Sequence, residues 1–362
     1  MTNTITEGQL TALGCCYVLG TMVVSSFITA VAGRDAWLMG LWGLVLFAPA
    51  LLCWLGLLRR HPGMGLFDIL EAVLGPALGR AVSLIFLIFF MALCALNVRE
   101  ATGFIHGGIM PDVPLAALAA LFAAVCVYGA RKGLGPMARL AAAFCIAACG
   151  GLALSLMSSL GQADFGHLLP TLNGRSLDYI QAGHIAAAIP YGEGLVLLML
   201  VPRLDGKARA GRALTRVAGF TAAVMTLVHL REVLTLGPLA AYLGQPSFEA
   251  VRMAGLTGAP ARTESLFALL LVSLTFFKTL ILFYVCLIGI KQVFRLEGAR
   301  ALAVPLALLL TAAALGVCGP QSDAALFGKN SAPFIWSAFT FVLPAVTLLT
   351  SHLRGTKKEA AS

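Results

Sequence analysis

Charged residues are scarce in this 362-residue chain, where Asp, Glu, Lys and Arg together make up only 11% of the sequence. Soluble globular domains carry about 25% charged residues, so an ordinary water-soluble protein is excluded. Hydrophobic residues make up 59%, which excludes intrinsic disorder, because disordered chains lack the apolar residues that build a core. A transmembrane helix needs about 20 residues, so the sequence predicts an all-α polytopic membrane protein.

Motifs for catalysis, nucleotide hydrolysis and metal binding are also missing. The sequence has no P-loop, no nucleophile elbow and no carboxylates at catalytic spacing, and its nine cysteines show no Cys-x-x-Cys pair. We therefore expect neither an enzyme nor an ATP-driven pump, with no catalytic residue, metal site or cofactor. The net charge of +9 is spread over short clusters, so no nucleic-acid partner is expected. The polar first eight residues predict no cleavable signal peptide.

Ten apolar segments are separated by charged or helix-breaking residues. Their approximate ranges are 9–31, 37–58, 79–105, 114–130, 137–158, 180–202, 213–236, 265–290, 301–318 and 332–352. We expect one transmembrane domain over 1–362, built from two repeats of five helices, about 9–158 and 180–352. Five is an odd number of crossings, so the second repeat is inverted relative to the first.

The basic residues predict the orientation of the chain. Of its 25 Lys and Arg residues, 17 lie in or beside the loops after segments 2, 4, 6 and 8 and in the C-terminal tail. The alternate loops hold only five. Lys and Arg accumulate on the cytoplasmic side of membranes, so both termini are predicted to be cytoplasmic.

Each repeat opens with a segment whose sequence does not favour a continuous helix. The first contains Gly20-Thr21-Met22 followed by Ser25-Ser26, and the sixth contains Ile189-Pro190-Tyr191-Gly192-Glu193-Gly194. Proline removes a helical hydrogen bond and glycine weakens the helix. Interrupted segments at matching positions of two repeats indicate a binding site of the kind found in transporters. A simple proline kink is the alternative.

Two charged residues lie near the middle of apolar segments, Glu193 in the sixth and Lys278 in the eighth. A charge at the helix centre costs about 2.5–3.5 kcal/mol on insertion scales. Lys278 is twelve residues from position 290, roughly 18 Å along a helix, too far for its side chain to reach the interface. It must face a cavity or an anion, either Glu193 or a substrate carboxylate. A purely structural ion pair is the alternative.

Other polar residues lie nearer the outer ends of segments 3 and 7. Arg99-Glu100 and Arg231-Glu232 are close enough to the interface for the arginines to act as anchors, while Asn97 is placed to face a central cavity. His229 and Glu232 share a helix face, as a proton relay or a structural contact.

Several short stretches carry a resemblance to a known family. In chain order they are Thr6-Glu7-Gly8-Gln9-Leu10, Arg34-Asp35-Ala36-Trp37-Leu38, His61-Pro62, Phe67-Asp68-Ile69-Leu70, Leu74-Gly75, Arg131-Lys132-Gly133 with Arg139, Leu169-Pro170, Ile189-Pro190-Tyr191-Gly192-Glu193 with Pro202, Pro246, Arg252, Arg262-Thr263-Glu264-Ser265-Leu266 and Phe277-Lys278. In this order the chain resembles the B subunit of endospore germinant receptors, the spore germination permeases of the amino acid–polyamine–organocation superfamily. It departs from them at Gly20-Thr21-Met22, where a Gly-x-Gly is usual, at Ser26-Phe27, where Leu-Pro is usual, and at the more charged Arg231-Glu232.

The resemblance implies a LeuT-like fold and a small germinant, typically an amino acid. Its carboxylate would bind the freed amides of helix 1 and its ammonium the carbonyls of the helix 6 interruption, with Lys278 in place of a sodium ion. The residues predicted to bind the ligand are Gly20, Thr21, Met22, Asn97, Ile189, Pro190, Tyr191, Gly192, Glu193 and Lys278.

The expected partners are receptor A and C subunits and the lipid bilayer, and the expected location is the spore inner membrane. One alternative is a secondary amino-acid transporter of the plasma membrane, either sodium-independent or with Glu193 carrying a coupling proton. Another is a scaffold that has lost ligand binding, which the departures in helix 1 favour.

Overall fold

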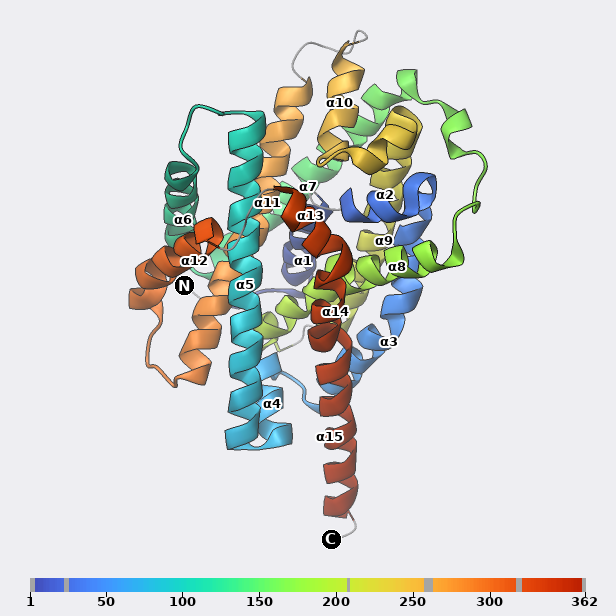
Figure 1. The fold of residues 1–362 in the computed structure, drawn as a ribbon. Helices are drawn as coiled ribbons and strands as arrows, with labels where there is room; N and C mark the ends of the chain where they lie inside the picture. The colour runs from blue at the N-terminus through green and yellow to red at the C-terminus, as the bar shows by residue number, and fades with distance from the viewer. Residues whose placement is uncertain (1–3, 23–25, 207–208, 257–262, 317–320, 360–362) are drawn as a thin grey trace.

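A computed structural model describes residues 4–22, 26–206, 209–256, 263–316 and 321–359 of the chain. Within these ranges the protein is helical, and its only extended pairing is a single parallel bridge between Ile5 and Leu204 (Figure 1). Ser25 and Arg262, which belong to the sequence motifs above, lie outside the described residues.

The helices follow the predicted segments closely. Their bounds are α1 Glu7–Met22, α2 Ser26–Ala32, α3 Met39–Arg60, α4 Leu66–Leu74, α5 Pro76–Gly108, α6 Leu115–Lys132, α7 Leu134–Ser159, α8 Ser176–Ala186, α9 Ala210–Leu236, α10 Pro246–Leu256, α11 Thr263–Val293, α12 Ala303–Gly316, α13 Gln321–Asn330, α14 Ala332–Ser337 and α15 Leu343–Glu359. Shorter helices of other types join some of them.

Eight helical stretches of the described chain are long and apolar enough to cross a membrane. The predicted segments 9–31 and 301–318 correspond to shorter helices, α1 with α2 and α12 respectively. The predicted all-α membrane architecture is confirmed, whereas the count of ten crossings stays a prediction.

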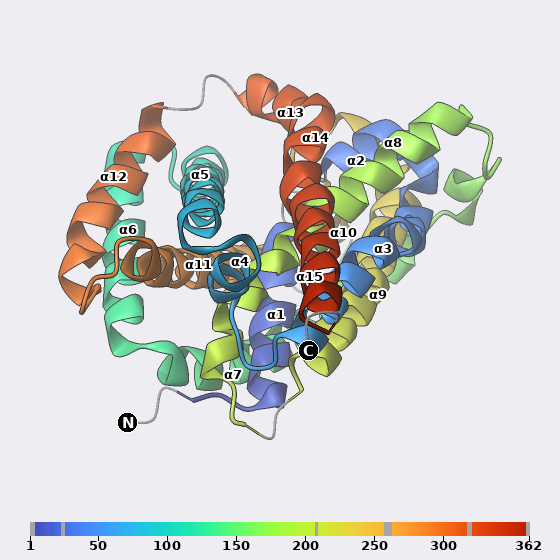
Figure 2. The same ribbon diagram turned by 90° about the horizontal axis from the view of Figure 1, so that it is seen from below.

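The sixth predicted segment lies at the centre of the molecule, and others lie at its edge. In the most apolar window of Ser176–Arg203, 94% of the residues are buried, against 17% for Leu134–Gln162. Helix α1 is also central, because it packs against α7, α9 and α11 (Figure 2). Outer side chains such as Ile146 and Leu121 are largely exposed, as expected for residues that face lipid.

The predicted interruption of the sixth segment is a change of helix type. Helix α8 continues into a π-helical turn, η4, over Ala187–Tyr191, and then into a 3₁₀ helix, η5, over Gly192–Arg203. Pro190 lacks the N–H that an α-helix needs, so the hydrogen-bond pattern must change here. The chain stays helical through the interruption, so the expected breakage of helix 6 is a local rearrangement of its hydrogen bonds.

A second π-helical turn, η8 over Ala338–Val342, lies between α14 and α15 and was not predicted. Pro344, close behind it, has no N–H to donate to the carbonyl four residues earlier, that of Thr340. The indole Nε1–H of Trp54 on α3 donates to this carbonyl at 3.1 Å. The sequence signal was Pro344, a proline near the middle of the last apolar segment.

Candidate ligand-binding site

The two charges predicted at mid-membrane depth meet in the structure. The ammonium of Lys278 on α11 lies 2.7 Å from Oε2 of Glu193 on η5, and the side chains are only 3% and 4% exposed. Lys278 therefore has the anionic partner that its distance from the helix end requires. An ion pair out of contact with water needs further hydrogen bonds to offset its lost hydration.

Neighbouring side chains supply these further contacts. Trp336 on α14 donates its indole N–H to Oε1 of Glu193 at 3.1 Å, and the hydroxyl of Thr21 on α1 lies 3.4 Å from Oε2. The ammonium of Lys278 also lies 5.5 Å from the ring centroid of Tyr17, within the range of a cation–π contact. Four elements, α1, η5, α11 and α14, thus contribute side chains to the contacts of the pair, and Glu100 on α5 is a second acid near both of its members.

Two glycines let these elements approach closely. A Cβ on Gly20 would lie 2.7 Å from Cβ of Lys278 and 2.8 Å from the carbonyl oxygen of Leu274. On Gly192, next to Glu193, it would lie 2.5 Å from the hydroxyl oxygen of Thr340 in η8. Real Cβ atoms do not come so close, so the absence of a side chain allows α1 to pack on α11 and η5 on η8.

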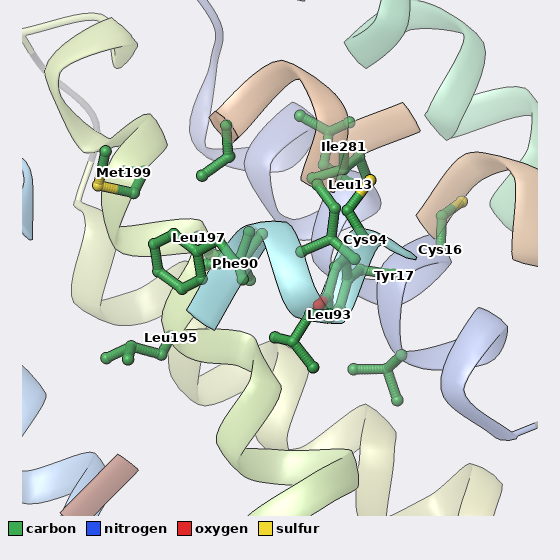
Figure 3. Packing of buried hydrophobic residues seen from close by; sticks show 14 of the residues in the cluster. Leu13, Cys16, Tyr17, Phe90, Leu93, Cys94, Leu195, Leu197, Met199 and Ile281 are labelled. Atoms are coloured by element: carbon green, nitrogen blue, oxygen red, sulfur yellow. The ribbon is translucent and has the colours of Figure 1, made fainter. Parts of the chain in front are cut away.

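A buried apolar cluster meets the ion pair at Tyr17. Figure 3 shows Tyr17 with Leu13, Leu93, Cys94 and Ile281, members of one buried cluster drawn from α1, α5 and α11. The phenol oxygen of Tyr17 has no hydrogen-bond partner among the described residues. The site is closed in this conformation, with an unused polar group beside Lys278.

Some of the predicted binding residues do not face the ion pair. The hydroxyl of Tyr191 donates to the carbonyl oxygen of Gly40 on α3 at 2.5 Å, and its ring stacks on Phe47. The amide of Asn97 donates to Leu93 of its own helix, α5, at 2.7 Å, and its oxygen has no partner in the described part of the chain. Tyr191 thus fixes the π-helical turn against α3, while Asn97 keeps an acceptor available.

The remaining predicted residues are backbone or apolar positions. Ile189 and Pro190 are buried within the π-helical turn. Met22 ends α1, and its side chain lies outside the described residues. The structure thus gathers Gly20, Thr21, Gly192, Glu193 and Lys278 at one place, and leaves the binding role of all ten residues as a prediction.

Sequence reasoning missed three residues at the ion pair, Tyr17, Trp336 and Thr340. Tyr17 lies one helical turn before Gly20 and Thr21, so the helical period could have indicated it. Trp336 and Thr340 lie in the last apolar segment, where no charge or glycine marks a site. Their positions beside Glu193 and Gly192 depend on the packing of α14 and η8 against η5.

The prediction that Arg231 reaches the interface as an anchor is wrong, and its neighbour Glu232 is also buried. Both are buried on α9, 3% and 1% exposed. Arg231 donates to the hydroxyl of Ser155 on α7 at 2.6 Å and to the carbonyl oxygen of Ser247 on α10 at 3.2 Å. Glu232 accepts from the hydroxyls of Ser247 and of Thr29 on α2. Helix α10 packs on α9 and α11, so a residue near the outer end of α9 does not reach the surface.

Comparison with known proteins identifies the family to which this chain belongs. The sequence profile of the family described as spore germination protein, the spore permeases, matches residues 4–316. The chain belongs to the spore germination permease family. The match covers all of α1–α12, so it includes both members of the ion pair, and the family resemblance predicted from short sequence stretches is confirmed.

Two curated relatives from Bacillus subtilis (strain 168) carry similar names. Spore germination protein KB is 22% identical over 337 residues, 91% of this chain and 90% of its own length. Spore germination protein YndE is 24% identical over 365 residues, 98% of each chain. Family and relatives indicate a receptor-type or permease-type membrane protein, not an enzyme.

Solved structures support the fold. The structure of MhsT in complex with L-phenylalanine matches with a TM-score of 0.69 at 15% identity, over 96% of this chain and 89% of MhsT. Mhp1, a nucleobase-cation-symport-1 family transporter solved in a closed conformation, matches with a TM-score of 0.63 at 12% identity, over 95% of this chain and 79% of Mhp1. The spore permease fold of this chain is thus LeuT-like, as the resemblance implied.

Proposed function

We propose that this chain is the ligand-sensing, permease-like subunit of a spore germinant receptor, and that it binds a small amino acid at the Glu193–Lys278 ion pair. The observation that carries the proposal is the buried pair at 2.7 Å, placed where the glycine of α1 and the interruption of the sixth segment meet. Family membership supports the germination role.

The chemistry of an amino acid matches this site. The ligand carries one carboxylate and one ammonium, so it can pair its carboxylate with Lys278 and its ammonium with Glu193 without leaving a buried charge unpaired. The free carbonyl of Asn97 and the free phenol of Tyr17 are further polar groups for it. For the ligand to bind, the ion pair between Glu193 and Lys278 must break, and each side chain must pair with the ligand. This requires α1 and α11 to separate, and the bound ligand stabilises that separated state.

The signal is then a shift between closed and ligand-bound populations, limited by the ligand's difference in affinity for the two. We place the protein in the spore inner membrane with both termini cytoplasmic, and expect it to pass the change to receptor A and C subunits. Co-purification of these subunits from spores would test that assembly.

Germination tests the proposal directly. Spores lacking the gene are exposed to a panel of amino acids and complemented with wild type, Glu193→Gln or Glu297→Gln, the last removing an exposed carboxylate. We expect the deletion to abolish the response to one amino acid, and wild type and Glu297→Gln to restore it. Glu193→Gln should accumulate in the membrane without restoring it. Unchanged germination of the deleted strain with every amino acid would refute the proposal.

A working secondary amino-acid transporter is a second candidate, favoured by the match of 96% of the chain to MhsT, a protein solved with L-phenylalanine. Uptake of labelled amino acid by proteoliposomes that contain this chain alone would support it. In that case Glu193→Gln should abolish uptake that depends on a proton gradient, and deletion of the gene should lower uptake in growing cells and leave germination intact.

A further inference from the structure

A second polar site lies far from the central ion pair, between α4, the first turns of α5 and the last turn of α11. Here a cavity of about 100 Å³ is lined by Asp68, Glu71, Ser83, Gln292 and Arg295, among other residues. Figure 1 shows α4 beside the lower end of α5. Gln292 and Lys278 are both on α11, fourteen residues and roughly 21 Å apart along the helix.

Close packing of α4 on α5 directs Ser83 toward the cavity. A Cβ on Gly79 would lie 2.5 Å from the carbonyl oxygen of Leu70, so the two backbones touch at this glycine. Ser83 is one helical turn further along α5 and on the same face. It is 1% exposed, and its hydroxyl oxygen has no hydrogen-bond partner among the described residues.

Asp68 brings a negative charge that no basic side chain in the described part of the protein neutralises. Its carboxylate accepts only from neutral donors, the backbone N–H of Gly65 at 3.1 Å and Nε2 of Gln292 at 3.3 Å. Glu71 differs, since its carboxylate pairs with Arg80 at 3.6 Å and Arg295 at 3.7 Å.

Gln292 adds a second acceptor without a partner. Its Nε2 is bonded to Asp68, which directs the amide at this carboxylate, and its Oε1 is buried without a hydrogen bond within the described ranges. Buried polar atoms in native proteins are normally satisfied by protein, water or an ion. Asp68, Ser83 and Gln292 therefore present oxygen atoms to one small cavity, and Asp68 is the charged member of this set.

We propose that this cavity binds a monovalent metal cation, sodium or potassium, through the carboxylate of Asp68, Oγ of Ser83 and Oε1 of Gln292, with water completing its shell. Oxygen ligands replace the hydration shell of such ions. An anion is disfavoured because the carboxylate of Asp68 has no basic partner within the described residues, and Oε1 of Gln292 can only accept a hydrogen bond. Calcium takes more oxygen ligands and magnesium needs a near-ideal octahedral shell, whereas Glu71, the other carboxylate here, is already shared by two arginines. No cluster of three acidic, His or Cys groups suited to a metal is found among the described residues.

The bound cation would tie α4 and α5 to the end of the helix that carries Lys278. Its effect should be measurable on the full-length protein in nanodiscs, as thermal unfolding in sodium, potassium or choline chloride at one ionic strength. We expect a saturable rise in the unfolding temperature with sodium or potassium over choline. Asp68→Asn should abolish the rise, and Ser83→Ala should weaken the apparent affinity about tenfold, the size seen when groups around a metal are removed.

Glu297→Gln is the matched control, since it removes an exposed carboxylate from the loop that follows α11 without touching the cavity. Equilibrium binding of ²²Na⁺ and ⁸⁶Rb⁺ gives a direct readout that does not depend on unfolding. If Asp68→Asn does not fold, Ser83→Ala carries the test, because it leaves the hydrogen bond to Gly65 in place.

Equal unfolding temperatures in all three salts together with no bound isotope would overturn the proposal. So would a cation effect that survives unchanged in Ser83→Ala and Asp68→Asn. Parallel samples in magnesium or calcium chloride complete the test, and an unfolding-temperature rise seen only in those two salts would also overturn it. Germination plays no part in these measurements, so their failure would leave the proposed receptor function standing.

Discussion

The ion pair of Glu193 with Lys278 and the adjacent residues Arg231 and Glu232 each bury an acid and a base, but with different partners. In the first, residues from two helices meet each other at 2.7 Å. In the second, neighbours on α9 point about 100° apart, and each binds residues of other elements. We call them the central pair and the outer pair.

The difference shows what each pair is suited to do. The two members of the central pair bind each other directly, so a molecule with its own carboxylate and ammonium can replace each partner. The outer pair joins α9 to α2, α7 and α10 through serine and threonine hydroxyls and a backbone carbonyl. Replacing it would need several groups at once, so it is suited to holding the outer elements together.

Breaking the central pair should have the largest effect. Lys278→Met leaves Glu193 as an uncompensated buried charge, and loss of one partner of a buried ion pair costs about 3–5 kcal/mol. We expect the free energy of unfolding, measured by SDS-induced unfolding of the protein in detergent micelles, to fall by that amount.

The double variant Glu193→Gln/Lys278→Met is the control for this prediction. It removes both charges, so it should be more stable than Lys278→Met alone, with a coupling energy of about 2 kcal/mol between the two sites. Purely additive effects of the two substitutions would show that Glu193 and Lys278 do not stabilise each other.

The same set of two single variants and one double variant should give a different result for the outer pair. Arg231→Met and Glu232→Gln each remove hydrogen bonds that involve a charged group, worth about 1.5–3 kcal/mol. Because the two side chains bind other residues, the free energy of unfolding of the double variant should fall by nearly the sum of the two single losses. The coupling energy should be under about 1 kcal/mol.

Ser247 explains why some coupling remains in the outer pair, since its hydroxyl contacts Glu232 and its carbonyl oxygen contacts Arg231. Ser247→Ala should destabilise by about as much as Glu232→Gln, because it removes the hydroxyl and leaves the carbonyl for Arg231. A coupling in the outer pair as large as in the central pair would remove the distinction between them.

The central pair could be predicted from the sequence because the position of each residue along its apolar segment gives its depth in the membrane. Lys278 is too far from either end of its segment to reach water, and Glu193 has a matching depth next to a proline and two glycines. The interrupted sixth segment followed from Pro190 in the same way. Both inferences depend on properties of single helices, namely the depth of a charge and the position of a proline, and these can be read directly from the sequence.

The outer pair was misjudged because depth alone does not determine burial. Its distance from the end of α9 suggested that Arg231 reaches the interface, but Ser247 of α10 covers it. Trp336 was missed for a related reason, since its contact with Glu193 depends on how the last segment packs. Contacts between helices that are distant in the sequence leave no periodic pattern in the sequence of either helix.

Gly20→Ala should have a smaller effect on stability than breaking the central pair or the outer pair. It tests how closely α1 approaches Lys278. The new Cβ would lie 2.7 Å from Cβ of Lys278 and 2.8 Å from a backbone oxygen of Leu274, and overpacking of this kind costs about 1–3 kcal/mol. Gly150→Ala on α7 is the matched control, since nothing lies within 4 Å of its added Cβ and alanine favours a helix by up to about 1 kcal/mol. The same unfolding assay should show a loss for Gly20→Ala and none for Gly150→Ala. Equal stabilities would mean that α1 and α11 are further apart, and that the central pair is open to a ligand without any separation of these helices.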